Sequence, residues 1–255
     1  MTDQQPANPQ PGKRSRLKLP LVQLLPNLLT VGALCAGLTA IRFAAEGRFG
    51  FAVAMIVIAA ILDGLDGRLA RLLKSESEIG AELDSLCDLV NFGVAPGLVV
   101  YLWALNDMRS EGWIAALIYV VACLLRLARF NIGNRAPDSD GNTFQGVPSP
   151  AGAMLVLLPL IVSSTFGSAQ IVPNAVVALW MIAVGAMMVG RFRTPSFKKA
   201  TIYADHARYI VLAFVVLVAA LMTYPWATLA VIDIAYLGVV LFSLYRYWRR
   251  PKLDI

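Results

Sequence analysis

Eight apolar segments follow one another along this chain, and most of them are long enough to cross a lipid bilayer as a helix. Hydrophobic residues make up 58% of the sequence and charged residues only 15%, with a mean hydropathy of +0.67. The sequence therefore predicts an all-α fold, a polytopic membrane helix bundle with about eight transmembrane helices. The predicted spans are Leu21–Ala45, Phe51–Leu73, Leu83–Ala104, Trp113–Phe130, Pro150–Phe166, Val172–Val189, Tyr209–Thr223 and Trp226–Tyr247.

Basic residues are distributed unevenly between the two sides of this predicted bundle. If the amino terminus lies inside the cell, all but three of the 22 Lys and Arg residues fall on the cytoplasmic side, and the exceptions are Arg42, Arg48 and Arg109. Cytoplasmic loops carry such an excess of positive charge, and an even number of spans agrees with both termini lying on that side. We therefore expect a multi-pass protein of the plasma (inner) membrane with both termini in the cytoplasm. The net charge of +6 reflects this bias and an attraction to anionic lipid, not nucleic-acid binding, because no soluble basic domain is evident.

The expected domain organisation is simple. Residues 1–19 form a cytoplasmic tail that begins polar and rich in Pro and Gln, ends basic, and is expected to be disordered. One membrane domain covers residues 20–248, and residues 249–255 form a second, basic tail.

Four aspartates occur at the cytoplasmic ends of two neighbouring spans: Asp63 and Asp66 in the second, Asp84 and Asp88 in the third. An ionised Asp at the centre of a bilayer costs roughly 2.5–3.5 kcal/mol, so four of them require compensation. Divalent cations provide it, because hard cations such as Mg²⁺, Mn²⁺ and Ca²⁺ prefer oxygen ligands. Solvation or pairing with neighbouring arginines is the ordinary alternative for any one acid, but it explains four together less well.

The spacing of these residues places them on helical stripes. Asp63, Asp66, Gly67, Ala70 and Arg71 follow at i, i+3, i+4, i+7 and i+8, which is one face of a helix. The other two aspartates lie four residues apart on the next span, after a short polar loop. We expect the two acidic stripes to face each other and to hold one or two divalent ions. Gly67 and Ala70 leave room for a substrate beside the acids, and Arg71 offers a fork of donors to phosphate.

The segment from residue 63 to residue 88 satisfies the pattern D-x-x-D-G-x-x-A-R-(eight residues)-G-x-x-x-D-x-x-x-D at every position. This pattern resembles the signature of the CDP-alcohol phosphatidyltransferases, enzymes that displace CMP from a CDP-linked lipid by attack of an alcohol. The resemblance implies a divalent-metal cofactor of two ions, Mg²⁺ or Mn²⁺ in the first place and Ca²⁺ as a further candidate. The implied metal ligands are Asp63, Asp66, Asp84 and Asp88. The implied contacts with the CDP-lipid come from Asp63, Gly67, Ala70 and Arg71.

The attacking alcohol also needs a proton acceptor, and a carboxylate at the edge of a metal site can serve. Asp88 lies one turn deeper in its helix than Asp84, closer to an incoming alcohol. We therefore expect Asp88 to be the catalytic base.

Further segments resemble one branch of this family, the membrane-embedded phosphatidylserine synthases. They are Leu25-Pro26-Asn27-Leu28-Leu29-Thr30, Asp88-Leu89-Val90-Asn91-Phe92-Gly93-Val94-Ala95-Pro96, Leu125-Arg126-Leu127-Ala128-Arg129-Phe130-Asn131 and Phe144-Gln145-Gly146-Val147-Pro148. The resemblance implies that CDP-diacylglycerol and L-serine are the substrates, phosphatidylserine and CMP the products, and a homodimer the assembly. It also implies that Asn27 and Thr30 contact the CDP-lipid.

Serine binding requires an anion site for the carboxylate. Arg126 and Arg129 end the fourth span on its cytoplasmic side, and a spacing of three residues puts them on one helix face. We expect one of them to pair with the carboxylate of serine, and Asn91 and Asn131 to add amide contacts. The alternative for both arginines is ordinary cytoplasmic positive charge.

Two other functions stay open at this point. One is the same chemistry with a phosphorylated acceptor, such as glycerol 3-phosphate or an inositol phosphate. Such an acceptor requires three or more Arg or Lys side chains that converge on its phosphate, and the sequence alone does not say how many converge. A cation transporter would distribute its acids through the membrane depth, often with broken helices and internal repeats. Here the acids gather at one face and no repeat is evident.

Overall fold

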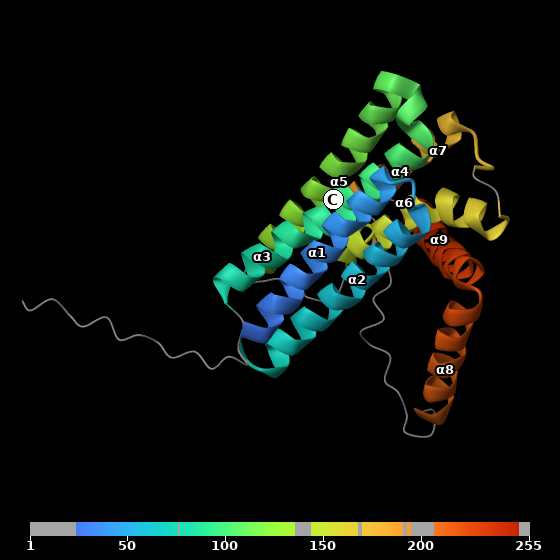
Figure 1. Ribbon diagram of the computed structural model, residues 1–255. Coiled ribbons are helices and arrows are strands. Elements are labelled where there is room, and N and C mark those ends of the chain that lie inside the picture. Colours follow the sequence, from blue (N-terminus) through green and yellow to red (C-terminus); the bar gives the residue numbers. More distant parts are fainter. Residues whose placement is uncertain are drawn as a thin grey trace, which may run out of the picture.

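The computed structural model describes residues 24–75, 77–135, 144–167, 170–190, 193–194 and 207–249, and this part of the chain is almost entirely helical (Figure 1). The α-helices are α1 (Leu25–Ala45), α2 (Phe49–Leu72), α3 (Glu78–Asp88), α4 (Ala95–Val100), α5 (Arg109–Arg135), α6 (Ser149–Thr165), α7 (Asn174–Val189), α8 (Ala207–Thr223) and α9 (Pro225–Arg249). Two π-helices, η2 (Leu89–Val94) and η3 (Tyr101–Leu105), and a 3₁₀-helix, η4 (Asn106–Met108), complete the segment between α3 and α5. The two-residue strands β1 (Phe144–Gln145) and β2 (Arg193–Thr194) pair antiparallel, with Phe144 opposite Thr194.

Each predicted span falls on a helical segment, so the prediction of an all-α fold is confirmed apart from this short strand pair. Five segments are long and apolar enough to cross a membrane, and three shorter apolar helices accompany them. The five are Leu25–Ala45, Phe49–Leu72, Glu78–Met108, Ser110–Gly133 and Pro225–Arg249, and the three are Ser149–Thr165, Asn174–Val189 and Val211–Thr223. The exact number of spans and the side on which the termini lie stay predictions. The tail predicted at residues 1–19 lies outside the described residues, as do residues 250–255.

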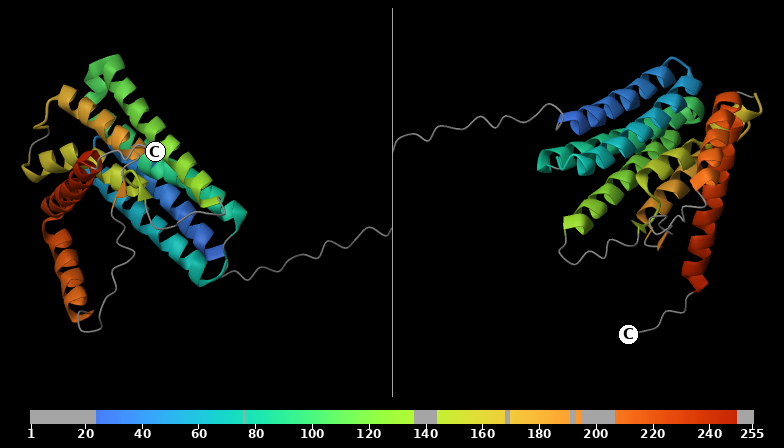
Figure 2. Two further views of the ribbon diagram at one scale, coloured as in Figure 1. Left: turned by 180° about the vertical axis from the view of Figure 1, so that it is seen from behind. Right: turned by 90° about the horizontal axis from the view of Figure 1, so that it is seen from below.

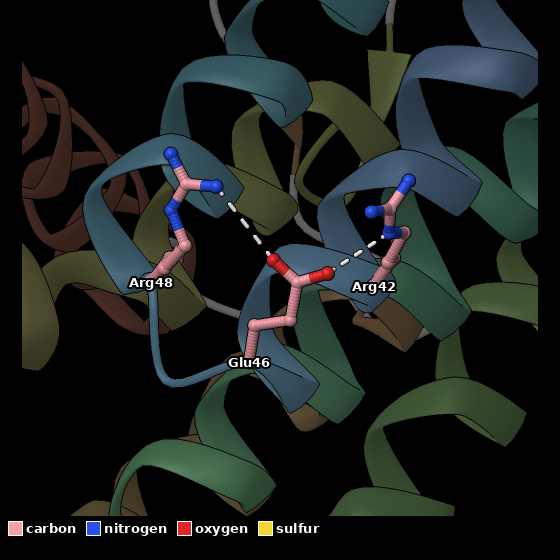
Figure 3. A network of polar contacts seen from close by, with 3 residues as sticks. All are labelled: Arg42, Glu46 and Arg48. Carbon is pink, nitrogen blue, oxygen red and sulfur yellow. Dashed lines mark hydrogen bonds and ion pairs between the residues drawn. The ribbon is translucent and has the colours of Figure 1, made fainter.

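The helices α1 and α2 form a hairpin through close packing of small residues. Ala33, Ala36, Ala40 and Ala44 are buried along one face of α1, and helix interfaces within membranes favour such residues because the backbones can approach closely. Figure 3 shows the turn that closes the hairpin, where Glu46 accepts a 2.9 Å hydrogen bond from Arg42 and pairs with Arg48 at 3.7 Å. These exposed pairs add little stability, so small-residue packing holds the hairpin together.

The third apolar segment is irregular directly after Asp88. The π-helix η2 begins there, and the Tyr119 hydroxyl of α5 donates a 2.7 Å hydrogen bond to the carbonyl oxygen of Phe92 inside it. Gly93 permits the close approach, since an added Cβ would lie 3.2 Å from the Cβ and Sγ of Cys123. Single π-turns occur often at functional sites. This one fixes the end of the helix that carries two of the aspartates.

The remaining helices cover the bundle on the side of α6. Pro159 cannot donate a backbone hydrogen bond inside α6, and the indole Nε1 of Trp180 on α7 donates instead to the carbonyl oxygen of Leu155, at 2.7 Å. Helix α9 packs along α6, and α7 packs against α5 and α6. Helix α8 packs against α9 and extends away from the rest of the bundle, with most of its apolar side chains exposed, as lipid-facing residues are (Figures 1 and 2).

Candidate active site and metal centre

The structure brings three of the four predicted aspartates into one group. Carboxylate oxygens of Asp63 and Asp66 on α2 and of Asp84 on α3 all lie within 4.8 Å of one another. Asp66 is buried, with 3% of its surface exposed, while Asp63 and Asp84 are half-buried. Three clustered carboxylates repel one another, so a divalent cation among them would lower the energy of the arrangement. We call this set the acidic triad.

Helix α1 orients the buried member of the acidic triad. The Thr30 hydroxyl lies 2.6 Å from the Oδ2 atom of Asp66 and 3.1 Å from the carbonyl oxygen of Pro26. Thr30 is itself buried, so its hydroxyl holds Asp66 from the protein side and leaves the other carboxylate oxygen for a ligand. Outer-shell hydrogen bonds of this kind fix the direction of metal-binding carboxylates. The expected contact of Thr30 with the CDP-lipid is untested, and the structure directs its hydroxyl to Asp66.

The side of α2 beside the acidic triad is open. A Cβ added at Gly67 would meet no atom within 4 Å, and both Gly67 and Arg71 are exposed. The Nε atom of Arg71 donates a 3.0 Å hydrogen bond to the carbonyl oxygen of Gly67, and Ala70 is half-buried beside them. The bare backbone and the guanidinium therefore leave room at the triad for a phosphate-bearing ligand.

Helix α1 also borders the start of α3. The Ser77 hydroxyl accepts a 3.0 Å hydrogen bond from the backbone N–H of Gly80 and caps α3. The Oδ1 atom of Asn27 lies 3.1 Å from the position of a Cβ added at Gly80. Asn27, predicted to contact the CDP-lipid, thus lies at the helix that carries Asp84.

Asp88 lies beside the acidic triad and interacts with a half-buried arginine. Its carboxylate contacts Asp63, and it interacts electrostatically with Asp84 and with Arg126 of α5. Its Oδ1 atom is shielded from solvent and has no hydrogen-bond partner among the residues that the structure describes. The Nη1 atom of Arg126 donates a hydrogen bond to the hydroxyl of Ser149, the first residue of α6. A carboxylate one helical turn beyond Asp84 thus interacts electrostatically with a guanidinium.

The other residues predicted to bind the acceptor are placed differently. Arg129 is exposed, and its Nη1 atom donates a 2.8 Å hydrogen bond to the carbonyl oxygen of Val189 at the end of α7. The amide of Asn131 donates a 2.9 Å hydrogen bond to the Ser85 hydroxyl. Asn91 is 1% exposed, and its Oδ1 atom lies against Gly37 of α1. Of these four predicted residues, Arg126 is the one that interacts electrostatically with Asp88.

Two polar residues near Arg126 were missed by the sequence analysis. Ser149 holds the guanidinium, and Tyr236 of α9 interacts with it electrostatically. The sequence did not indicate a role for either residue, because each is an isolated polar residue in a segment far along the chain from the acidic motif. Only the packing of α5, α6 and α9 brings them to this position.

The fold and the site together define a class of protein. It is a membrane-embedded helical protein with a group of carboxylates that suits a divalent cation, and this group is open on one side to a phosphate ligand. Sequence comparison identifies the family. A profile of the CDP-alcohol phosphatidyltransferases matches residues 23–190, and a second profile, described as CDP-alcohol phosphatidyltransferase 2, matches residues 209–240. The chain belongs to the CDP-alcohol phosphatidyltransferase family.

Curated relatives are similar over most of the chain. The CDP-diacylglycerol–serine O-phosphatidyltransferase of Mycobacterium leprae is 38% identical over 91% of this chain and 78% of its own length. The enzyme of the same name from Mycobacterium tuberculosis is 37% identical over 88% of this chain and 79% of its own. That of Helicobacter pylori is 36% identical over 69% of this chain and 73% of its own.

Proposed function

We propose that this protein transfers the phosphatidyl group of CDP-diacylglycerol to the hydroxyl of L-serine, giving phosphatidylserine and CMP. The observation that carries the proposal is the acidic triad, with Asp88 in contact with Asp63 and Arg126 in electrostatic interaction with Asp88. The names of the curated relatives support CDP-diacylglycerol and serine as the substrates.

The reaction follows from the positions of these side chains. The serine hydroxyl oxygen forms a bond to the phosphorus on the diacylglycerol side, and the bond from that phosphorus to the oxygen of CMP breaks, with its electron pair leaving on CMP. Asp88 accepts the proton of the hydroxyl, because it is the carboxylate on the deep side of the triad. Arg71 and the open backbone at Gly67 receive the nucleotide phosphates.

Asp63, Asp66 and Asp84 would hold a divalent ion, Mg²⁺ or Mn²⁺, with a second ion held next to Asp88. Such ions supply positive charge to the pyrophosphate oxygens as the bond to CMP breaks. The donor set suits this role because it consists of carboxylate oxygens only, one of them oriented by Thr30.

The acceptor side favours a small zwitterion over a phosphorylated alcohol. In the described parts of the chain, Arg126 is the basic residue that interacts electrostatically with Asp88, while Arg129 bonds to Val189 and Arg71 lies at the exposed side of the triad. One guanidinium suits one carboxylate, whereas a phosphate monoester needs several convergent cations. This arrangement supports serine over glycerol 3-phosphate or an inositol phosphate. Membership in a transferase family leaves no support for the transporter alternative.

The membrane placement belongs to the same proposal. The chain is a membrane protein, and basic residues of the turns next to the acidic triad support a site at the cytoplasmic face of the plasma membrane. Acyl chains then stay in lipid while the nucleotide and serine reach the site from the cytosol. The homodimer stays a prediction, with small residues in α1 compatible with close helix contacts.

An acceptor screen tests this function. Purified protein would receive CDP-diacylglycerol, Mg²⁺ or Mn²⁺, and one alcohol at a time, with CMP and the lipid product both measured. We expect metal-dependent phosphatidylserine formation with L-serine. CMP release with glycerol 3-phosphate or an inositol phosphate alone would overturn serine as the acceptor and keep the family chemistry. No CMP release with any acceptor would contradict the transferase assignment.

A further inference from the structure

Two buried polar atoms on helices far apart in the sequence lack hydrogen-bond partners among the described residues. They are the Nε atom of Arg126 on α5 and the hydroxyl oxygen of Tyr236 on α9. Neither bonds to any residue in the described ranges, and both are shielded from solvent. Asp88 Oδ1, Asn91 Oδ1, Asp233 Oδ2 and Ser75 Oγ are likewise buried without a partner among the described residues. Buried polar atoms are nearly always hydrogen-bonded, so two potential donors of this kind that interact electrostatically with each other require an explanation.

The packing of α5, α6 and α9 brings the side chains of Arg126 and Tyr236 into the same region of the bundle. Helix α9 packs along α6, and Ser149 at the start of α6 accepts a hydrogen bond from Nη1 of Arg126. The side chains of Tyr236 and Arg126 lie close enough to interact electrostatically, and Arg126 interacts in the same way with Asp88. Ser149 therefore holds the Nη1 atom of the guanidinium, while Nε has no partner among the described residues. The same guanidinium interacts electrostatically with the phenol of Tyr236 and with the carboxylate of Asp88.

We propose that Tyr236 is an acceptor-binding residue that donates a hydrogen bond to the carboxylate of serine while Arg126 pairs with the same carboxylate. This inference rests on the proposed function, because it requires an acceptor with a carboxylate. A guanidinium donates to a carboxylate through parallel N–H groups and leaves lone pairs of that carboxylate unused. The phenol of Tyr236 supplies the further donor, which accounts for a buried hydroxyl that no residue in the described ranges satisfies.

The geometry also fits the chemistry of the acceptor. The hydroxyl and the carboxylate of serine are separated by two carbon atoms, so a carboxylate held at Arg126 and Tyr236 directs the hydroxyl toward Asp88. Tyr236 lies in the segment matched by the second family profile, residues 209–240. Helix α9 would therefore contribute to acceptor selection, while α2 and α3 contribute to nucleotide binding.

The test is the variant Tyr236→Phe in the full-length protein, which keeps the ring and removes only the unpaired hydroxyl. At saturating CDP-diacylglycerol and Mn²⁺, we expect the KM for L-serine to rise roughly tenfold to a hundredfold, as for the loss of a hydrogen bond to a charged group. The KM for CDP-diacylglycerol and the concentration of Mn²⁺ at half-maximal rate should not change. The matched control is Tyr247→Phe on the same helix, where the tyrosine is exposed and no change is expected.

A thermal-unfolding measurement gives an independent readout. L-serine should raise the Tm of the wild-type protein in the presence of CMP and Mn²⁺, and the same concentration should raise the Tm of the Tyr236→Phe protein by much less. An unchanged KM for serine, or an equal loss in kcat/KM for serine and for CDP-diacylglycerol, would overturn the role of Tyr236. A wild-type protein that forms no phosphatidylserine would overturn the proposed function instead, so the two failures are distinguishable.

Discussion

The Thr30 hydroxyl donates a 2.6 Å hydrogen bond to a carboxylate oxygen of Asp66, and this contact joins α1 to the acidic triad. Both residues are buried, and 36 positions separate them in the sequence. The bond has two consequences. It holds the Oδ2 atom of Asp66, a member of the acidic triad, and it ties the direction of this carboxylate to the packing between α1 and α2.

We predict that Thr30→Val weakens metal binding without unfolding the protein. Valine has nearly the same shape but cannot donate, so Asp66 loses the group that fixes its orientation. Loss of such an outer-shell partner typically lowers metal affinity roughly 10-fold to 100-fold. The measurement is the Mn²⁺ concentration that gives half-maximal CMP release, together with direct Mn²⁺ binding. Thr39→Val is the matched control, because Thr39 on the same helix is half-buried and bonds to the carbonyl oxygen of Cys35 in its own helix, away from the acidic triad. Equal Mn²⁺ affinity in the two variants would contradict the role given to Thr30.

The helical fold and the aspartates of the acidic triad could be predicted from the sequence, because each depends on the pattern of residues within a single segment. Apolar runs fix where helices form, and the observed bounds of α1 and α7 agree closely with the predicted spans. The spacing of Asp63 and Asp66 fixes a helix face whatever the helix packs against. The Thr30–Asp66 hydrogen bond and the interaction of Tyr236 with Arg126 depend instead on which helices pack together. The periodicity of a single helix does not contain this information.

The position of Asn91 depends on a feature that helical periodicity does not predict. An α-helical spacing from Asp84 and Asp88 places Asn91 on the acidic stripe, but the π-helix η2 begins at Leu89. A π-turn adds a residue to the helical repeat, so the α-helical spacing no longer holds beyond Asp88. Asn91 consequently lies with its Oδ1 atom against Gly37 of α1. The sequence contained no sign of the π-helix.

This contact leads to a prediction about stability. A Cβ at Gly37 would lie 2.1 Å from Oδ1 and 3.3 Å from the Cα of Asn91, so Gly37→Ala must displace either Asn91 or α1. Overpacking of this kind costs about 1–3 kcal/mol. The expected result is a lower Tm in detergent. Gly238→Ala on α9 is the control, since its Cβ meets nothing within 4 Å and alanine favours the helix by about 1 kcal/mol. Equal Tm values for the two variants would show that α1 and η2 are less closely packed than the structure indicates.

Gly67 provides a test of the open side of the triad. A side chain there meets no atom within 4 Å, so Gly67→Leu is expected to fold normally and to project into the space assigned to the nucleotide. We predict that kcat/KM for CDP-diacylglycerol falls at least about tenfold, the effect of a loss of about 1.4 kcal/mol in binding. The control is Gly133→Leu on α5, which is equally open and exposed. A Gly67→Leu enzyme with wild-type kcat/KM would place the nucleotide elsewhere.

Asp88 provides the most direct test of the chemistry. Asp88→Asn keeps the size of the side chain but removes its capacity to accept a proton, and general-base catalysis contributes typically about 10²–10⁴-fold to a rate. We therefore predict a fall in kcat of that order, with Mn²⁺ affinity reduced less than by Asp66→Asn, because Asp66 is a member of the triad and Asp88 lies beside it. Removal of one negative charge next to Asp63 should leave the Tm unchanged or raise it. Asp107→Asn is the matched control, an exposed acid in η4 at the other end of the same helical segment. Substantial turnover by Asp88→Asn would exclude Asp88 as the base, whereas a parallel loss of Mn²⁺ binding and kcat would make Asp88 a metal ligand.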